Sequence, residues 1–156
     1  MEVQTIGKMT PISNSATNNM EIKYFQTTIN KLPGTSYSEV YKHAHEFFEI
    51  IRKRTKRQPY VRSAFFKKEK IFFNIFWKHI FEKSFKVRTE RLKYFSATVA
   101  LIKLSRINPM SKENSENREE ILHRFYGKTK AGQKFIVQIK ENKRTKAKHL
   151  MSMFPE

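Results

Sequence analysis

The chain has 156 residues, which fits one domain and is too short for two of ordinary size. Its 32 Lys and Arg outnumber its 14 acidic residues and give a net charge of +18, which indicates a polyanionic partner, nucleic acid first. The absence of Cys excludes disulfides, zinc ribbons and a cysteine nucleophile. Because every acidic residue is Glu, metal-free chemistry is favoured over two-metal phosphoryl transfer.

The first twenty residues are polar and poor in large apolar side chains, and they predict a flexible tail ahead of a single domain over residues 21–156. They do not contain a basic segment followed by an apolar one, and no stretch approaches the roughly 18 apolar residues of a membrane span. The sequence therefore predicts a cytoplasmic protein without a membrane partner.

The first part of the domain has helical periodicity. Ser36 or Ser38 is expected to cap a helix that continues to Ile51. A wide apolar arc predicts a second helix over residues 70–83, buried in the middle of the fold, and apolar side chains on one face predict a third over residues 87–104.

Residues 52–70, between the first two predicted helices, contain nine Lys or Arg against one Glu. Tyr60, Phe65 and Phe66 alternate with this charge and are suited to stack on bases if they are exposed. The alternative, that Phe65 and Phe66 anchor the segment to the core, has equal weight. The residues expected to contact phosphates here are Arg52, Lys53, Arg54, Lys56, Arg57, Arg62, Lys67 and Lys68.

The last part of the chain changes from helical to alternating periodicity. A polar segment over residues 111–120 predicts a loop. Alternation over residues 121–126 and 135–140, with Gly132 in the turn between them, predicts two strands, and residues 149–154 predict a third.

The expected fold class is therefore α+β, with N-terminal helices (about 36–104) packed on one face of a small C-terminal antiparallel meander (about 121–154). A three-residue loop that ends at Gly132 pairs residues whose numbers have an even sum, so residues of equal parity share a face. Odd positions supply the apolar side that faces the helices, and even positions supply an open polar face that suits a site. Its polar members are Arg124, Tyr126, Gln138 and Lys140.

Metal-free cleavage of RNA needs a base for the 2′-hydroxyl, an acid for the leaving oxygen and fixed positive charge near the phosphate. The residues expected to be catalytic are His123, Arg124, Tyr126 and Lys140, with His149 and Glu141 as further titratable candidates. The odd number of His123 favours an inward, structural position. A cationic setting is expected to lower the pKa of Tyr and His. Further substrate contacts are expected from Gln138, Lys143, Arg144 and Ser152, and no metal or cofactor is expected.

Several segments resemble phage- and mobile-element-borne domains of the barnase, EndoU, colicin E5/D and RelE nuclease superfamily. These are Tyr60 to Phe66, Ile121 to Gly127 and Phe135 to Glu141, followed by Arg144 and Ser152 to Pro155. The likeness covers roughly residues 58–155. It implies helices on one side of a small antiparallel sheet and a metal-free set of His, Arg, Lys, Tyr or Ser on the other side that cuts RNA. No catalytic residue is carried over by position.

The sequence thus predicts a basic protein that acts on nucleic acid, with RNA favoured over DNA, as a metal-independent endoribonuclease of mobile-element or toxin type. The alternative is a nucleic-acid-binding accessory or regulatory protein without catalysis. The charge alone also fits an acidic lipid, or an acidic partner protein such as an inhibitor or antitoxin.

Overall fold

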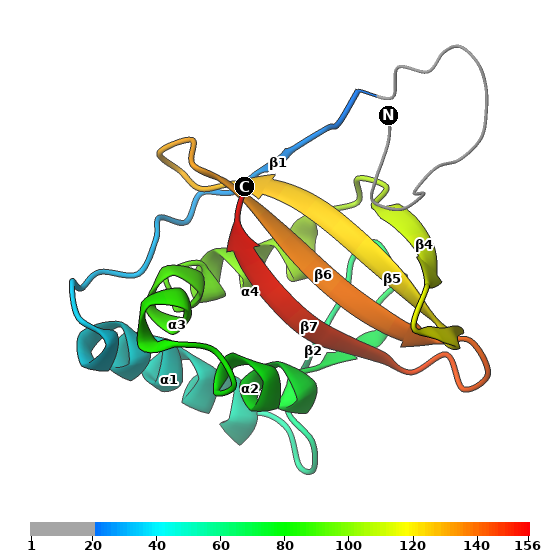
Figure 1. Cartoon of the computed structure of the whole chain (residues 1–156), viewed down its shortest axis with the longest axis horizontal. Helices are drawn as coiled ribbons and strands as arrows, with labels where there is room; N and C mark the ends of the chain where they lie inside the picture. Colours follow the sequence, from blue (N-terminus) through cyan, green and yellow to red (C-terminus); the bar gives the residue numbers. More distant parts are fainter. Residues whose placement is uncertain (1–20) are drawn as a thin grey trace.

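The computed structural model describes residues 21–156, and the predicted tail over residues 1–20 lies outside them. The described residues form four helices and seven strands (Figure 1). The helices are α1 (Tyr37–Lys53), α2 (Asn74–Ile80), α3 (Phe85–Leu92) and α4 (Phe95–Leu104). The strands are β1 (Phe25–Gln26), β2 (Tyr60–Arg62), β3 (Lys70–Phe72), β4 (Met110–Asn114), β5 (Asn117–Lys128), β6 (Lys134–Asn142) and β7 (Lys148–Pro155).

All seven strands belong to one mixed sheet, which is curled as a half-barrel (Figure 1). The strand order is β1-β5-β6-β7-β3-β2, and β4 also pairs with β5. The β5–β6 and β6–β7 pairs are antiparallel, whereas β1 on β5 and β3 on β7 are parallel. The predicted α+β architecture, in which helices pack on a small antiparallel meander, is therefore wrong.

The missed strands have a common cause, which is that their sequences lack an apolar alternation long enough to detect. The strands β2 and β3 are three residues each. The strand β2 lies inside the basic segment and β3 begins at its last residue, Lys70, which pairs with Arg62. The strand β4 is polar and lies in the segment predicted as a loop; an edge strand needs few apolar side chains. Each of these strands is short or marginal and is held by its neighbour in the sheet.

The first helix follows the prediction more closely than the others. Ser36 caps α1, because its Oγ accepts a hydrogen bond from the Glu39 amide at 3.3 Å and the Glu39 carboxylate reaches back to the Ser36 amide. The predicted helix over residues 70–83 instead begins as β3 and is helical only in α2. The predicted helix over residues 87–104 is broken into α3 and α4.

Aromatic side chains from three helical segments form the centre of the core. The ring centroids of Phe48, Phe73, Phe76 and Trp77 lie 5.6–6.3 Å from that of Phe95, which is fully buried. These contacts join α1, α2 and α4, and such ring pairs stabilise a core beyond the area they bury. Within residues 21–156, none of the helices has both the length and the apolar character needed to cross a membrane.

The register of β5 and β6 confirms the parity prediction, because every pair from Glu120↔Asn142 to Lys128↔Lys134 has an even sum. Gly132 has φ of 92°, the left-handed conformation expected at this turn. The odd-numbered Phe125, Phe135, Val137 and Ile139 are 4% exposed or less, and Phe135 stacks on Tyr94 at 5.3 Å. A Cβ on the odd-numbered Gly127 would meet Leu101 of α4 and the Phe135 ring, so the odd-numbered side faces the core and the even-numbered side chains of β5 and β6 lie on the other face.

Candidate functional site

Polar side chains form two adjacent rows on the even-numbered side of β5, β6 and β7. One row consists of Arg124, Gln138 and Ser152, and the next contains Lys140 and His149. A β-bulge at Met151 lies between these rows in β7. The bulge allows His149 and Ser152 to share a face although their numbers differ in parity. We call this surface, with its five polar side chains, the polar face.

Arg124 is held by neutral groups rather than by a carboxylate. Its Nε donates to Gln138 Oε1 at 3.0 Å, and its Cζ lies 5.9 Å from the centre of the Phe154 ring. Among the described residues no acidic group forms an ion pair with it. A guanidinium in this state is available to bind an anion in two-pronged geometry.

Lys140 and His149 face each other across β6 and β7. The Lys140 Nζ lies 3.2 Å from Glu120 Oε2, so part of its charge is compensated. Burial lowers the pKa of His149, and the nearby Lys140 lowers it further. His149 is therefore neutral at neutral pH and suited to accept a proton.

Tyr126 lies on the same side of the sheet but further along it, opposite Ile136. Burial raises the pKa of Tyr126, and the neighbouring Arg124 only partly opposes this. The expectation that a cationic setting lowers the pKa of tyrosine is thus wrong for Tyr126. The pKa of His149 does move in the expected direction, with burial as its largest cause. Tyr126 therefore stays protonated at neutral pH and is able to donate a hydrogen bond.

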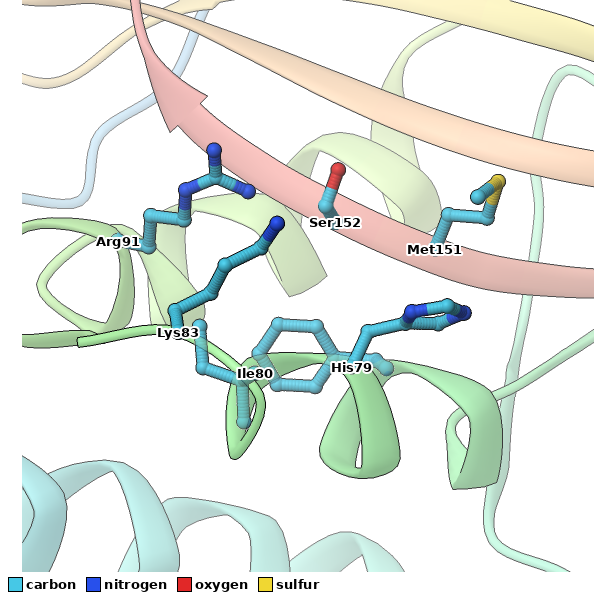
Figure 2. A pocket seen from close by; sticks show the side chains of 7 residues that line it. His79, Ile80, Lys83, Arg91, Met151 and Ser152 are labelled. Carbon is cyan, nitrogen blue, oxygen red and sulfur yellow. The ribbon is translucent and has the colours of Figure 1, made fainter. Parts of the chain in front are cut away.

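A pocket of about 100 Å³ opens beside the polar face, between α2, α3 and β7. Figure 2 shows the Arg91 guanidinium, the Lys83 ammonium and the Ser152 hydroxyl directed toward the same space, with His79 further along. Arg91 also contacts the Phe154 ring, with its Cζ 5.2 Å from the ring centre. Helical periodicity gives no signal for Arg91, Lys83 or His79 as binding residues, because the pocket depends on the break between helices and on the bulge in β7.

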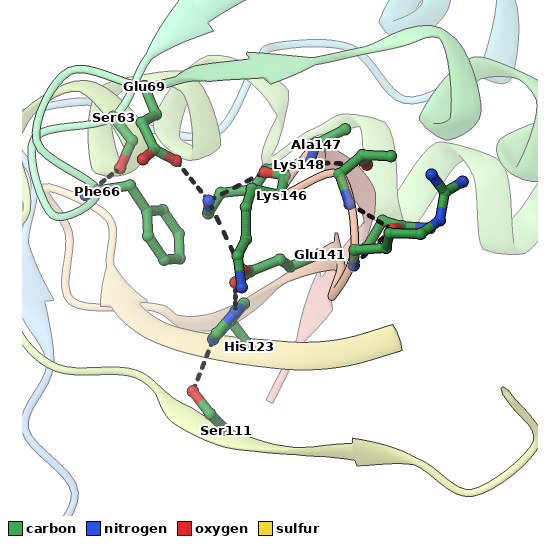
Figure 3. Close-up of polar contacts among 12 residues, drawn as sticks. Ser63, Phe66, Glu69, Ser111, His123, Glu141, Lys146, Ala147 and Lys148 are labelled. Atoms are coloured by element: carbon green, nitrogen blue, oxygen red, sulfur yellow. Dashed lines mark hydrogen bonds and ion pairs between the residues drawn. The ribbon is translucent and has the colours of Figure 1, made fainter. Parts of the chain in front are cut away.

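His123 lies on the opposite side of the sheet, in a chain of polar contacts that crosses four strands (Figure 3). Its Nδ1 lies 2.7 Å from Ser111 Oγ, and its Nε2 lies 2.8 Å from Glu141 Oε1. The Lys148 Nζ is 3.8 Å from Glu141 Oε2 and also donates to Glu69. His123 is only 8% exposed and has partners on both ring nitrogens. Because it lies on the odd-numbered side, the sheet separates it from Arg124, Tyr126 and Lys140.

Because two histidines are partly buried, we expect the free energy of unfolding to decrease in mild acid. Burial lowers the pKa of His123, although Glu141 opposes this, and it lowers that of His149. As the pH falls below their ordinary value of 6.5, the unfolded chain takes up protons first, so the free energy of unfolding decreases until the folded pKa is reached. The slope is at most about 1.4 kcal/mol per pH unit for each histidine.

Urea unfolding between pH 7.5 and 5 measures this slope, and H149N is expected to remove the contribution of His149. A wild-type protein that is more stable at pH 5.5 than at pH 7.5 would contradict the assignment.

The predicted basic segment divides into parts with different surroundings. Arg52, Lys53, Arg54, Lys56 and Arg57 are exposed at the end of α1 and just beyond it. The Arg52 guanidinium donates to the Glu49 carboxylate at 2.7–2.9 Å, which makes it less available to contact a phosphate. Lys67 and Lys68 occupy the turn between β2 and β3, both with positive φ.

The aromatics of this segment also divide. The rings of Phe65 and Phe66 lie 5.7 and 5.9 Å from that of the buried Phe125. Both are partly buried and anchor the segment to the core, which favours the anchoring alternative over base stacking. Tyr60 pairs with Phe72, which pairs with His149, so these three share one side of the sheet. Arg62 and Lys70 lie over the Tyr60 ring at 5.4 and 4.7 Å. An aromatic and cationic strip thus leads to the polar face.

The remaining predicted contacts, Lys143 and Arg144, lie in the turn between β6 and β7. Lys143 forms an ion pair with Glu113, and the Arg144 amide donates to Asn142 Oδ1 within the turn. Within residues 21–156, no three His or Glu side chains are grouped so that they could hold a metal ion. Comparison with protein-family models, curated proteins and solved structures finds no match for the chain. The resemblance to the nuclease superfamily therefore remains a prediction from the sequence.

Proposed function

We propose that the polar face binds RNA and cleaves it without a metal ion, as a cytoplasmic endoribonuclease. One observation carries this proposal: a neutral His149 lies opposite Lys140 and one row from Arg124, whose guanidinium has no acidic partner among the described residues. A base, a proton donor and fixed positive charge are thereby within reach of one phosphate. A cationic face also repels a divalent cation.

The proposed reaction is an internal transfer at phosphorus. His149 takes the proton of a ribose 2′-hydroxyl, the 2′-oxygen forms a bond to phosphorus, and the bond to the 5′-oxygen breaks. The Lys140 ammonium gives a proton to that leaving oxygen, while Arg124 stabilises the negative charge on the phosphorane. The products are a 2′,3′-cyclic phosphate and a 5′-hydroxyl.

Tyr126 lies too far from Lys140 to take part in the same chemical step. Tyr126 lies in the row of Ile136, four residues along β6 from Lys140. At about 3.3 Å per residue, the two rows are about 13 Å apart, too far to share one phosphate. We assign Tyr126 to binding of the strand beyond the cleaved bond, and we assign no catalytic role to His123.

The direct test incubates the purified protein with single-stranded RNA in EDTA and analyses the new ends. We expect cleavage that leaves a 2′,3′-cyclic phosphate. Intact RNA that is nevertheless bound with salt-dependent affinity would overturn the proposal and select the non-catalytic alternative. Binding to acidic vesicles without affinity for RNA would favour the lipid alternative.

The exposed cluster at the end of α1 gives a second, smaller expectation. R54A and R57A are each expected to weaken RNA binding by similar amounts for different sequences, and to reduce the slope of log affinity against log salt by about 1. R52A is expected to have a smaller effect, because Arg52 already binds Glu49. Filter binding at several salt concentrations measures these slopes, and a loss that depends strongly on RNA sequence would indicate base contacts instead.

A further inference from the structure

The pocket between α2, α3 and β7 combines apolar side chains with cationic ones in its lining. The apolar side chains of Phe76, Ile80 and Met151 line it, and Phe76 and Ile80 are buried. Its polar lining consists of Lys83, Arg91, His79 and Ser152. None of these lining residues is acidic. Every polar group in the lining is able to donate a hydrogen bond to an anion.

The positive charge in this pocket has little compensation from the protein. His79 Nδ1 lies 3.4 Å from Glu82 Oε1, which is the one ion pair that the described residues supply to the lining. Arg91 and Lys83 have no acidic partner among them. Burial lowers the pKa of Arg91, which shows that its charge is partly removed from water. A half-buried guanidinium without a counter-charge is costly unless a ligand supplies one.

The pocket has room for a small anion. Its volume is about 100 Å³, on a measure by which one water molecule needs roughly 10–15 Å³. That space admits a tetrahedral phosphate group. Arginine is the side chain best suited to bind a phosphate through two parallel hydrogen bonds.

We propose that this pocket is a phosphate-binding subsite that holds one phosphate group of the RNA, beside the phosphate cleaved on the polar face. Ser152 belongs to both places, because it lines the pocket and lies in the row of Arg124. Arg91 and Arg124 also contact the same Phe154 ring. The identity of the substrate rests on the proposed function, whereas phosphate binding itself does not.

The first experiment uses inorganic phosphate as the probe. Calorimetric titration at constant ionic strength, set with chloride, is expected to show one saturable site on the wild-type protein. R91Q and K83A are each expected to weaken it about tenfold or more, as for loss of a hydrogen bond to a charged group. K86A is the matched control, because Lys86 is exposed on the same helix as Arg91, does not line the pocket and carries the same charge as Lys83.

Absence of saturable phosphate binding to the wild-type protein would overturn the proposal. So would R91Q and K83A binding phosphate no more weakly than K86A. Circular dichroism of each variant confirms that it is folded, and R91K, which keeps the charge but loses the planar fork, is expected to bind with intermediate affinity.

A second experiment distinguishes the source of the phosphate with 2′-O-methyl RNA, which lacks the attacking hydroxyl. Oligonucleotides with a 5′-phosphate, a 3′-phosphate or two hydroxyl ends are compared on wild-type protein and R91Q. A terminal phosphate in the pocket gives a preference for one phosphorylated end that R91Q abolishes, whereas an internal phosphate gives an equal loss for all three. Phosphate binding without any RNA cleavage would refute the proposed function alone, and cleavage that R91Q and K86A affect equally would refute the subsite alone.

Discussion

Replacing Arg124 and Lys140 together with alanine is expected to abolish RNA cleavage while the protein stays folded. Removal of one group that stabilises developing negative charge costs about 10²–10³ in rate, and loss of a proton donor costs about 10²–10⁴. We therefore expect the double variant to lose at least about 10³ in the rate of cleavage, measured in EDTA with end-labelled RNA. Unchanged activity would place the active site elsewhere.

The stability of that variant is expected to fall, but not enough to unfold the protein. Lys140 loses an ion pair with Glu120 whose side chains are 22% and 16% exposed, so the loss exceeds the roughly 1 kcal/mol of a surface pair. Glu120 keeps the hydrogen bond that it accepts from Asn114 Nδ2 at 3.0 Å. The matched control removes the same two charges from the exposed Lys103 and Arg106, at and beyond the end of α4. This control is expected to keep the cleavage rate within a few-fold of the wild type.

The pH dependence of the cleavage rate distinguishes the role of His149 as the base from the roles of the cationic groups. Cleavage by the wild-type protein is expected to rise with pH through the pKa of His149, which burial places below 6.5. H149A is expected to lose about 10²–10⁴ in rate and, with it, this acidic limb of the profile. A profile that keeps the limb in H149A would assign the base to another group.

The sequence predicted the parts of the site that depend on regular strands. Alternation in β5 and β6, together with the turn at Gly132, was sufficient to place Arg124, Gln138 and Lys140 on one side of the sheet, because the side-chain period of a strand is fixed at two residues. The same rule placed His123 on the opposite side. Capping by Ser36 was also predictable, since a capping box is a local signal.

The remaining features depend on interactions that are distant in the chain. The parallel pairing of β3 with β7 joins residues more than 70 positions apart, and no local pattern specifies it. The bulge at Met151 reverses parity within β7 and brings His149 onto the polar face. The sequence did not indicate Arg91 as a binding residue. The apolar period of α3 and α4 continues across the break between them, so a single helix was expected.

We expect replacement of Lys148, on the odd-numbered side of the sheet, to lower the free energy of unfolding. Lys148 is 4% exposed, and its Nζ donates to Glu69, lies 3.8 Å from Glu141 Oε2 and is 4.9 Å from the centre of the Phe66 ring. K148A removes the ammonium beside Glu141, whose side chain is 12% exposed and keeps its contact with His123 Nε2 at 2.8 Å. Removal of one member of a buried ion pair typically costs about 3–5 kcal/mol, and because His123 still contacts Glu141 we expect a loss at the lower end of that range.

Urea unfolding of four proteins tests this expectation: wild type, K148A, E141Q and the double variant. Because E141Q removes the carboxylate charge, K148A is expected to cost less in that background, and the difference is the coupling between the two residues. The control is K143A, which removes a lysine from the adjacent turn whose ion pair with Glu113 is 33% and 59% exposed, and which should cost about 1 kcal/mol or less. If K148A is no more destabilising than K143A, the contacts of Lys148 with Glu69 and Glu141 do not hold the turn between β2 and β3 against the sheet.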